Sequence, residues 1–242
     1  MFTDKPLGMK SYGSIPHIRG SRMGPGDHHI HDGQARIATE KFPGEGDWFC
    51  VVEVKLDGSN VSVAKIGTEI VAMSRAGYRA SQSPHEQHRL FDRWVRENWV
   101  RFDALLMDGE RICGEWLAQA HGTRYSLTHE PFVPFDLMSG HTRVLRDEFW
   151  KRVHAHGFTT PHVLHADSSP FSLDAMKKAI ETPMHGELDP VEGAVWRVER
   201  HDKRKIGVQF LCKYVRPEKV DGSYLFISGQ SGKLDPTWNW KP

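Results

Sequence analysis

Three short runs of β-branched residues, joined by tight turns, constrain the fold of this chain more than any other feature. They cover Phe49 to Val54, Val61 to Ile66 and Ile70 to Ser74, and such runs are typical of β-strands. Gly67-Thr68 separates the second and third runs, a spacing that predicts an antiparallel hairpin. Strands joined this tightly cannot be parallel neighbours, because a parallel connection needs a long crossover.

Further strand and helix patterns follow along the chain. Additional strands are expected at Arg111–Leu117, Pro131–Leu137, Gly193–Val198 and Ile206–Val215. Helices are expected after Pro84, from about Leu145 to His156, and from a Ser172 cap to Pro183. The apolar face of the first helix comprises Leu90, Phe91, Trp94, Val95 and Trp99. Strands outnumber helices and their turns are short, so the expected fold class is α+β, with mainly antiparallel sheets and flanking helices.

Length and charge exclude some classes of protein. The chain has 242 residues, with 32 Lys and Arg against 31 Asp and Glu. We expect a single domain over 1–242, in which 1–47 form an irregular arm rich in Gly, Pro and His and 218–242 form a short tail. A net charge of +1 excludes a histone-like binder that works by bulk positive charge, although it is compatible with a local basic groove.

Cysteine usage and hydropathy predict a soluble cytoplasmic protein. Cys50, Cys113 and Cys212 are dispersed in apolar runs, a pattern that predicts buried thiols rather than a disulfide framework or a cysteine zinc site. No stretch approaches the roughly 18 apolar residues that a membrane span requires.

A lysine in the loop after the first strand carries the strongest functional signal. It is Lys55, in the segment Glu53-Val54-Lys55-Leu56-Asp57-Gly58-Ser59-Asn60. One interpretation is an ordinary surface lysine, and the other is a nucleophile that takes up a nucleotidyl group. Holding a lysine neutral at pH 7 costs roughly 4.6 kcal/mol, given its ordinary pKa near 10.4. A nucleophilic lysine therefore needs cations, a metal ion or desolvation around it, and charged groups should recur downstream at strand ends.

Such groups do recur, in a consistent order. They are Ser74-Arg75, Gly114-Glu115, Phe132-Val133-Pro134-Phe135-Asp136, Glu192-Gly193 and Lys213. Together with Lys55 in its Lys-x-Asp-Gly segment, this order resembles the motifs of the covalent nucleotidyltransferases, which comprise ATP-dependent DNA and RNA ligases and GTP-dependent capping enzymes. Ser59-Asn60, Phe132 and the arm from Tyr12 to His17 are similar to the RNA ligase 2 and RNA-editing ligase branch. The resemblance implies an ATP-grasp-like nucleotidyltransferase domain.

The resemblance also implies a role for each matching residue. Lys55 would attack the α-phosphate of ATP and pass the AMP to a 5′-phosphate end, which a 3′-hydroxyl then seals. The implied ATP contacts are Glu53 for the adenine amino group, Phe132 for stacking on adenine, Glu115 for the ribose, Arg75 for the ribose or the 5′-phosphate, and Lys213 for the α-phosphate. Glu192 would hold Mg²⁺ or Mn²⁺, with Asp57 and Asn60 organising the loop and the metal-bound water. Lys55, Lys213 and Arg75 would be the catalytic residues.

Structural interpretations stand beside these roles. Phe132 and Phe135 alternate with Val133, and for Phe135 we favour a place in the core. Asp57 before Gly58 is equally typical of a turn. Glu115 and Glu192 lie in apolar strands, where an unpaired carboxylate is costly, so a paired or functional role is expected for both.

One position departs from the family pattern. The last-strand motif usually has two lysines spaced Lys-x-Lys, whereas the first position here is Leu211. Lys203, Arg204 and Lys205, or Arg216, are candidates to replace the missing cation.

A second candidate metal site lies in the arm. Residues Asp27-His28-His29-Ile30-His31-Asp32 contain imidazoles and carboxylates that bind zinc or manganese. A solvated loop has the same composition, so both interpretations stay open.

The function expected from these observations is an ATP-dependent RNA ligase that acts on nucleic-acid ends, with RNA favoured, in a nicked duplex or hybrid. The alternatives are a minimal ATP-dependent DNA ligase, a capping-type guanylyltransferase, or a catalytically weak end-binding module, which Leu211 favours. The tail is too short for an OB-fold or a separate C-terminal domain, so a partner that supplies such contacts is also considered.

Overall fold

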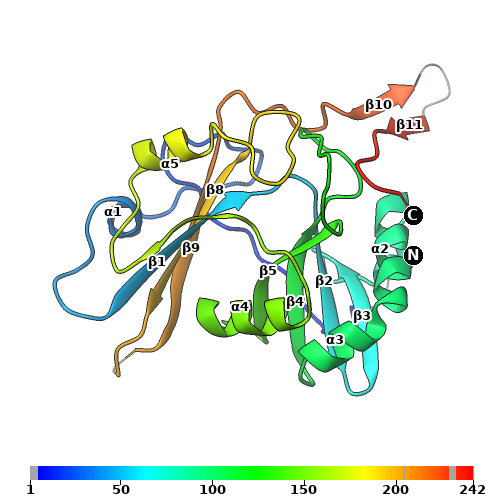
Figure 1. Cartoon of the computed structure of the whole chain (residues 1–242), viewed down its shortest axis with the longest axis horizontal. Coiled ribbons are helices and arrows are strands. Elements are labelled where there is room, and N and C mark those ends of the chain that lie inside the picture. Colours follow the sequence, from blue (N-terminus) through cyan, green and yellow to red (C-terminus); the bar gives the residue numbers. More distant parts are fainter. Residues whose placement is uncertain (1–4, 204, 229–232, 242) are drawn as a thin grey trace.

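Two antiparallel sheets form the framework of the molecule (Figure 1). The computed structural model describes residues 5–203, 205–228 and 233–241, so Arg204 lies outside the described residues. The first sheet contains, in spatial order, β7 (Val163–Asp167), β1 (Trp48–Lys55), β8 (Gly193–Arg200) and β9 (Gly207–Val215). The second contains β3 (Glu69–Ser74), β2 (Ser59–Ile66), β4 (Glu110–Trp116), β5 (Phe132–Ser139) and β6 (Thr142–Arg143). Near the C-terminus, β10 (Leu225–Ser228) and β11 (Lys233–Pro236) pair as a hairpin.

Helices flank both sheets (Figure 1). Their bounds are α1 (Asp32–Thr39), α2 (Glu86–Glu97), α3 (Trp99–Leu105), α4 (Arg146–Ala155) and α5 (Leu173–Ala179), with a short 3₁₀ turn at Ala80–Gln82. The α+β prediction is confirmed. Mainly antiparallel sheets were expected, and the strand pairs among the described residues are antiparallel. Ser172 caps α5 by accepting a hydrogen bond from the backbone N–H of Ala175, because its oxygen satisfies one of the unpaired N–H groups of the first turn.

Each sheet packs on its own hydrophobic core. Cys50, Val52 and Trp196 belong to the core of the first sheet. The second sheet and the helices α2, α3 and α4 enclose an aromatic core that contains Phe91, Trp94, Phe102, Trp116, Phe132, Phe149 and Phe158. All three cysteines are buried free thiols, as the sequence predicts.

The first predicted helix is divided into two helices, and the division places Trp99 at the surface instead of in the core. The helix α2 ends at Glu97, where Asn98 donates a side-chain hydrogen bond to the carbonyl oxygen of Trp94. Trp99 then begins α3 and is 54% exposed. The prediction that Trp99 continues the apolar face was therefore wrong. The spacing of apolar residues continues past Asn98 and does not show that the Asn98 side chain ends the helix there.

The arm is less irregular than predicted. Within 1–47, α1 forms over eight residues and buries Ala38 against the first sheet. The sequence signal was weak because α1 contains Gly33 and its cap residue, His31, makes no side-chain capping bond. Ahead of α1, the arm runs beside β9, where the N–H of Ile18 donates to the carbonyl oxygen of Lys213 at 2.9 Å.

The lysine loop is one of the connections between the two sheets. β1 ends at Lys55 in the first sheet, and β2 begins at Ser59 in the second. Gly58 is required in this crossover, because a Cβ there would overlap the carbonyl oxygen of Trp116. The loop that the motif analysis singled out therefore joins a strand of one sheet to a strand of the other.

Among the residues that the structure describes, no helix has the length and apolar character to cross a membrane.

Candidate active site

A pocket of about 630 Å³ opens between the two sheets at the lysine loop. Its lining includes residues from β1, β2, β3, β4, β5, β8 and β9, together with the N-terminal arm and the start of α2. Six of the predicted site residues line it, namely Glu53, Lys55, Asn60, Arg75, Glu115 and Lys213. Antiparallel pairing thus gathers side chains that are more than 150 positions apart in the sequence.

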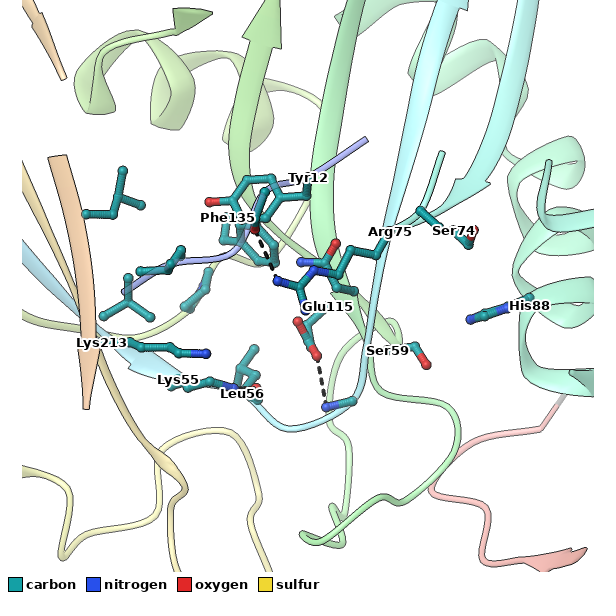
Figure 2. Close-up of a pocket in the computed structure, with 18 of the residues that line it drawn as sticks. Tyr12, Lys55, Leu56, Ser59, Ser74, Arg75, His88, Glu115, Phe135 and Lys213 are labelled. Atoms are coloured by element: carbon teal, nitrogen blue, oxygen red, sulfur yellow. Dashed lines mark hydrogen bonds between the residues drawn. The ribbon is translucent and has the colours of Figure 1, made fainter. Parts of the chain in front are cut away.

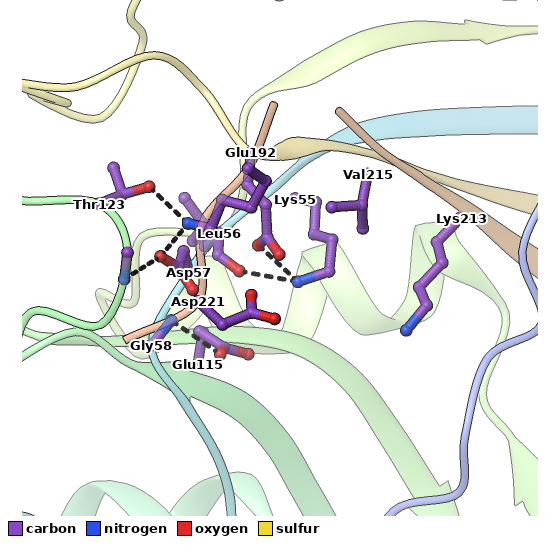
Figure 3. Close-up of polar contacts among 12 residues, drawn as sticks. Lys55, Leu56, Asp57, Gly58, Glu115, Thr123, Glu192, Lys213, Val215 and Asp221 are labelled. Carbon is purple, nitrogen blue, oxygen red and sulfur yellow. Dashed lines mark hydrogen bonds and ion pairs between the residues drawn. The ribbon is translucent and has the colours of Figure 1, made fainter. Parts of the chain in front are cut away.

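Lys55 and Glu192 form the central ion pair of this region (Figure 3). The Nζ of Lys55 lies 2.6 Å from Oε2 of Glu192, and both side chains are largely buried. Burial alone lowers the pKa of Lys55, but the negative charges of Glu192, Glu115 and Asp57 outweigh it and raise that pKa. The amine is therefore protonated in this arrangement, and it becomes a nucleophile only when positive charge competes for these carboxylates.

The negative charges of Glu115 and Glu192, the two carboxylates beside Lys55, are only partly compensated by positive charge. Burial raises the pKa of Glu115 to about 7, against the opposing effect of Lys55, and the charge of Glu192 adds to the rise. Burial also raises the pKa of Glu192. Glu115 accepts a hydrogen bond from the N–H of Gly58 at 3.0 Å, which fixes its carboxylate on the loop. Two buried carboxylates with raised pKa values indicate a place where an additional cation would be stabilised.

Lys213 and Arg75 approach the pocket from different strands (Figure 2). Lys213 lies on β9 opposite Val195, and its pKa is lowered by burial and by the charge of Lys55. Arg75 follows β3 and donates hydrogen bonds to the carbonyl oxygen of Gly13 and the hydroxyl of Ser14, each at 3.2 Å. Both residues line the pocket.

Glu53 and Asn60 also line the pocket. The carboxylate of Glu53 forms an ion pair with Arg146 at the start of α4. The amide oxygen Oδ1 of Asn60 is buried and has no hydrogen-bond partner among the described residues. Because an unsatisfied buried oxygen is costly, Asn60 is poised to accept a hydrogen bond from a ligand.

The two phenylalanines of β5 exchange the places that the sequence analysis gave them. Phe132 is 1% exposed and packs among Phe91, Trp94 and Phe158, away from the pocket. Gly114 accommodates its ring, since a Cβ there would lie against it. Phe135 instead lines the pocket and meets the edge of Tyr12 at 5.2 Å between ring centroids. The prediction that Phe132 stacks on a nucleobase and Phe135 belongs to the core therefore disagrees with this geometry.

Asp57 is held away from the pocket by a residue that the motif analysis missed. Its carboxylate forms a buried ion pair with Lys219 and accepts a hydrogen bond from the N–H of Gly122 at 2.7 Å. Lys219 also donates to the hydroxyl of Thr123 at 3.0 Å. Asp57 therefore acts in the loop, as the turn interpretation allowed, and its predicted metal role has no support in its position. No local signal distinguishes Lys219 from the other lysines of the tail.

The candidates for the missing lysine do not reach the site. Leu211 lines the pocket, whereas Lys203 and Lys205 lie in the β8–β9 turn, at the far end of both strands from Gly193 and Val215. Arg216 donates to the carbonyl oxygen of Pro190 instead of facing the pocket.

Arg197 lies directly across the sheet from Leu211. It pairs with Leu211 across β8 and β9 and lines the same pocket. Its guanidinium is already matched by Asp136 at 3.0 Å and Glu199 at 2.6 Å. Arg197 thus forms part of the pocket wall, and its positive charge is largely compensated by these two carboxylates.

The histidine cluster of the arm does not assemble a metal site in the part of the chain that the structure describes. The Oδ2 atom of Asp27 instead lies 3.1 Å from Nε2 of His17, and its Oδ1 atom lies 4.0 Å from Nζ of Lys213. The arm therefore contributes a carboxylate beside Lys213.

Comparisons with known proteins agree with this arrangement. A family model of RNA ligases matches residues 49–215. No curated protein matches the chain. Among solved structures, a lysine-to-alanine variant of the Naegleria gruberi RNA ligase with ATP and Mn has a TM-score of 0.52 at 17% identity, covering 71% of this chain and 50% of that chain. An aspartate-to-alanine variant of that ligase in its apo form has a TM-score of 0.54 at 14% identity, covering 88% and 59%.

These structural matches establish the fold, and the chain spans about half the length of the first of them. The family model extends from β1 to β9 and thus across both sheets and the pocket between them. The chain belongs to the RNA ligase family.

Proposed function

We propose that this protein is an ATP-dependent RNA ligase in which Lys55 forms a covalent bond to AMP. The observation that carries the proposal is the Lys55–Glu192 pair at 2.6 Å, at the edge of a pocket of about 630 Å³ that also holds Glu115, Lys213 and Arg75. A pocket of this volume accommodates a nucleotide. The carboxylates hold the nucleophile, and the cations offer partners for phosphate oxygens.

The nucleoside lies between the arm and the second sheet in this proposal. Phe135, backed by Tyr12, provides the aromatic surface for the base. Asn60 and Glu115 accept hydrogen bonds from the ribose, and Glu53 accepts one from the base. Lys213 binds the α-phosphate from β9. These roles follow from side chains that line one pocket and have acceptors or charges to offer.

A divalent cation fits the donor set. Glu192 and Glu115 are oxygen donors with raised pKa values, and Mg²⁺ or Mn²⁺ is commonly bound by one or two carboxylates together with substrate phosphates. When bound, the metal would neutralise phosphate charge and draw Glu192 away from Lys55 electrostatically. Lys55 could then lose its proton and attack the α-phosphate, with pyrophosphate as the leaving group.

Two transfers would follow from the lysyl adduct. A 5′-phosphate, bound by Arg75, attacks the adenylate and releases Lys55. A 3′-hydroxyl then attacks the activated 5′ end and releases AMP. Both steps depend on positioning and charge neutralisation.

The adduct provides the test of the proposal. Incubation with ATP or GTP labelled at the α-phosphate, followed by a denaturing gel, should label the wild-type protein with ATP. Lys55→Ala should abolish the label in a protein that still unfolds cooperatively, at a lowered melting temperature because the buried Glu192 loses its cation. A label that persists in Lys55→Ala would refute the assignment of the nucleophile, and labelling by GTP instead would favour a capping-type reaction.

Nick-sealing assays on all-RNA, all-DNA and hybrid duplexes would identify the substrate. Preferential sealing of a nick with RNA at its ends is expected. Preference for the all-DNA duplex would support the DNA ligase alternative.

A further inference from the structure

The pocket extends beyond Arg75 into a region that the nucleotide roles do not use. This region is lined by Tyr78, Ser83, His85 and His88, at the start of α2. In Figure 2, Lys55 and Lys213 lie on one side of Arg75, and His88 lies on the other. The region is continuous with the nucleotide side of the same pocket.

The geometry of phosphoryl transfer determines from which side of the pocket the 3′-hydroxyl must approach. In a phosphoryl transfer, the attacking and leaving oxygens lie roughly in line with the phosphorus. In the joining step, the leaving group is AMP, held near Lys55 and Lys213, and the 5′-phosphate lies at Arg75. The 3′-hydroxyl must therefore approach from the opposite side, where His88 is found.

His88 is held in one orientation at that place. Its Nδ1 lies 2.7 Å from the hydroxyl of Ser83, which is itself 8% exposed and accepts a hydrogen bond from the N–H of His85 at 3.2 Å. Because the Ser83 hydroxyl is fixed from two directions, the imidazole is fixed with it, and its ring borders the pocket.

We propose that His88 is a catalytic residue for the joining step, in which its Nε2 accepts the proton of the attacking 3′-hydroxyl. This inference rests on the proposed function. The active tautomer carries hydrogen on Nδ1, which donates to the Ser83 oxygen, and so leaves the Nε2 lone pair free for the substrate. The new bond joins the 3′-oxygen to phosphorus, the bond from phosphorus to AMP breaks, AMP leaves with the electron pair, and the proton moves to Nε2.

The surroundings keep the imidazole in its basic form. Burial, and then the neighbouring His85 and His121, lower the pKa of His88 to about 4. The ring of His85 lies 5.5 Å from that of His88, and Arg89 donates to the carbonyl oxygen of Ser83 at 2.8 Å. These neighbours include no carboxylate, so His88 is neutral at pH 7. A pKa this low makes the imidazole a weak base, and the negative charge of a bound 5′-phosphate would raise its pKa toward the operating pH.

The test isolates the joining step. A nicked RNA duplex with a chemically pre-adenylylated 5′ end is mixed with excess enzyme without ATP, and single-turnover sealing is measured. His88→Asn should seal roughly 100-fold more slowly, in the range that general-base catalysis contributes. Formation of the Lys55 adduct from ATP should be unchanged, because His88 lies away from the nucleotide side. His88→Ala should regain part of its sealing rate when imidazole is added.

The matched control is His141→Asn, an exposed histidine in the β5–β6 turn, which should seal at the wild-type rate. Unchanged sealing by His88→Asn would overturn the inference, as would a loss that imidazole does not restore. A wild-type protein that seals this nick with His88 dependence but forms no adduct would refute the proposed function and leave the role of His88 standing. A wild-type protein that does not seal the nick would refute both.

Discussion

At the scale of single residues, the two faces of β5 decide which aromatic ring lines the pocket. Phe132 and Phe135 are three positions apart, so they point to opposite faces of the strand. The helices α2 and α3 cover the face that carries Phe132, and the pocket takes the face that carries Phe135. One ring therefore stabilises the fold while the other is available to a ligand.

Alanine substitutions should separate these two roles. Phe132→Ala should lower the free energy of unfolding by about 3–5 kcal/mol, because it removes a buried aromatic ring. Phe135→Ala should have a smaller effect on stability and weaken ATP binding by about 1–3 kcal/mol, the range of base–aromatic stacking. Denaturant unfolding and calorimetric ATP titration would measure both quantities. Weaker ATP binding by folded Phe132→Ala, with normal binding by Phe135→Ala, would reverse the assignment.

At the scale of elements, the first sheet is anchored beside Lys55 by a histidine. The N–H of His162 donates to Nε2 of His185 at 2.8 Å, and the carbonyl oxygen of His162 accepts from Val54 of β1 at 2.9 Å. Burial lowers the pKa of His185 to about 4, with Glu187 opposing and His129 and His162 adding to the effect. His185 is therefore neutral in the folded protein and accepts the hydrogen bond from His162.

This anchor predicts a loss of stability in acid. The pKa of His185 is about 4 in the folded chain and near 6.5 in an unfolded one. The unfolded state therefore binds the proton first as the pH falls, so the contribution of His185 is complete above pH 6.5 and is lost between about pH 6.5 and 4. It amounts to roughly 3 kcal/mol. Unfolding free energies measured across this range should fall less steeply for His185→Gln, and equal slopes would contradict the prediction.

At the scale of the whole molecule, the C-terminal segment reaches back to the lysine loop. Lys219 pairs with Asp57, and Asn239 accepts from the N–H of Tyr125 at 3.0 Å. The hydroxyl of Tyr125 in turn accepts from the N–H of Asp57 at 2.9 Å. Residues after β9 thus fix the crossover that presents Lys55.

Removal of one partner of this buried pair should be costly. Lys219→Met leaves the Asp57 carboxylate buried without its cation, and a loss of about 3–5 kcal/mol in unfolding free energy is expected. The double variant Lys219→Met with Asp57→Asn should regain part of that loss, since no unpaired charge remains. Chemical denaturation of the variants would measure this, with Lys178→Met on the exposed side of α5 as the control. A double variant no more stable than Lys219→Met would show that the loss does not come from an unpaired charge at Asp57.

Much of the framework could be predicted because its signals are local. β-Branched runs and short turns indicated the principal strands, and the order of motifs from Lys55 to Lys213 indicated a nucleotidyltransferase site. The structure brings Lys55, Arg75, Glu115 and Lys213 to one pocket as that order implies. The helix α1 and the strand β7 were missed, because short elements with mixed polarity have little periodicity.

The amino-acid sequence by itself determined the strands, the antiparallel turns and the identity of the charged groups, since each depends on residues close together along the chain. Only the tertiary structure decided which phenylalanine faces the pocket. It also decided that Lys219 forms the ion pair with Asp57 and that His88 borders the region beyond Arg75. The physical reason is that alternation along a strand defines two faces without saying which one is covered. Which face is covered, and which distant charge becomes a partner, depends on packing between elements far apart in the chain.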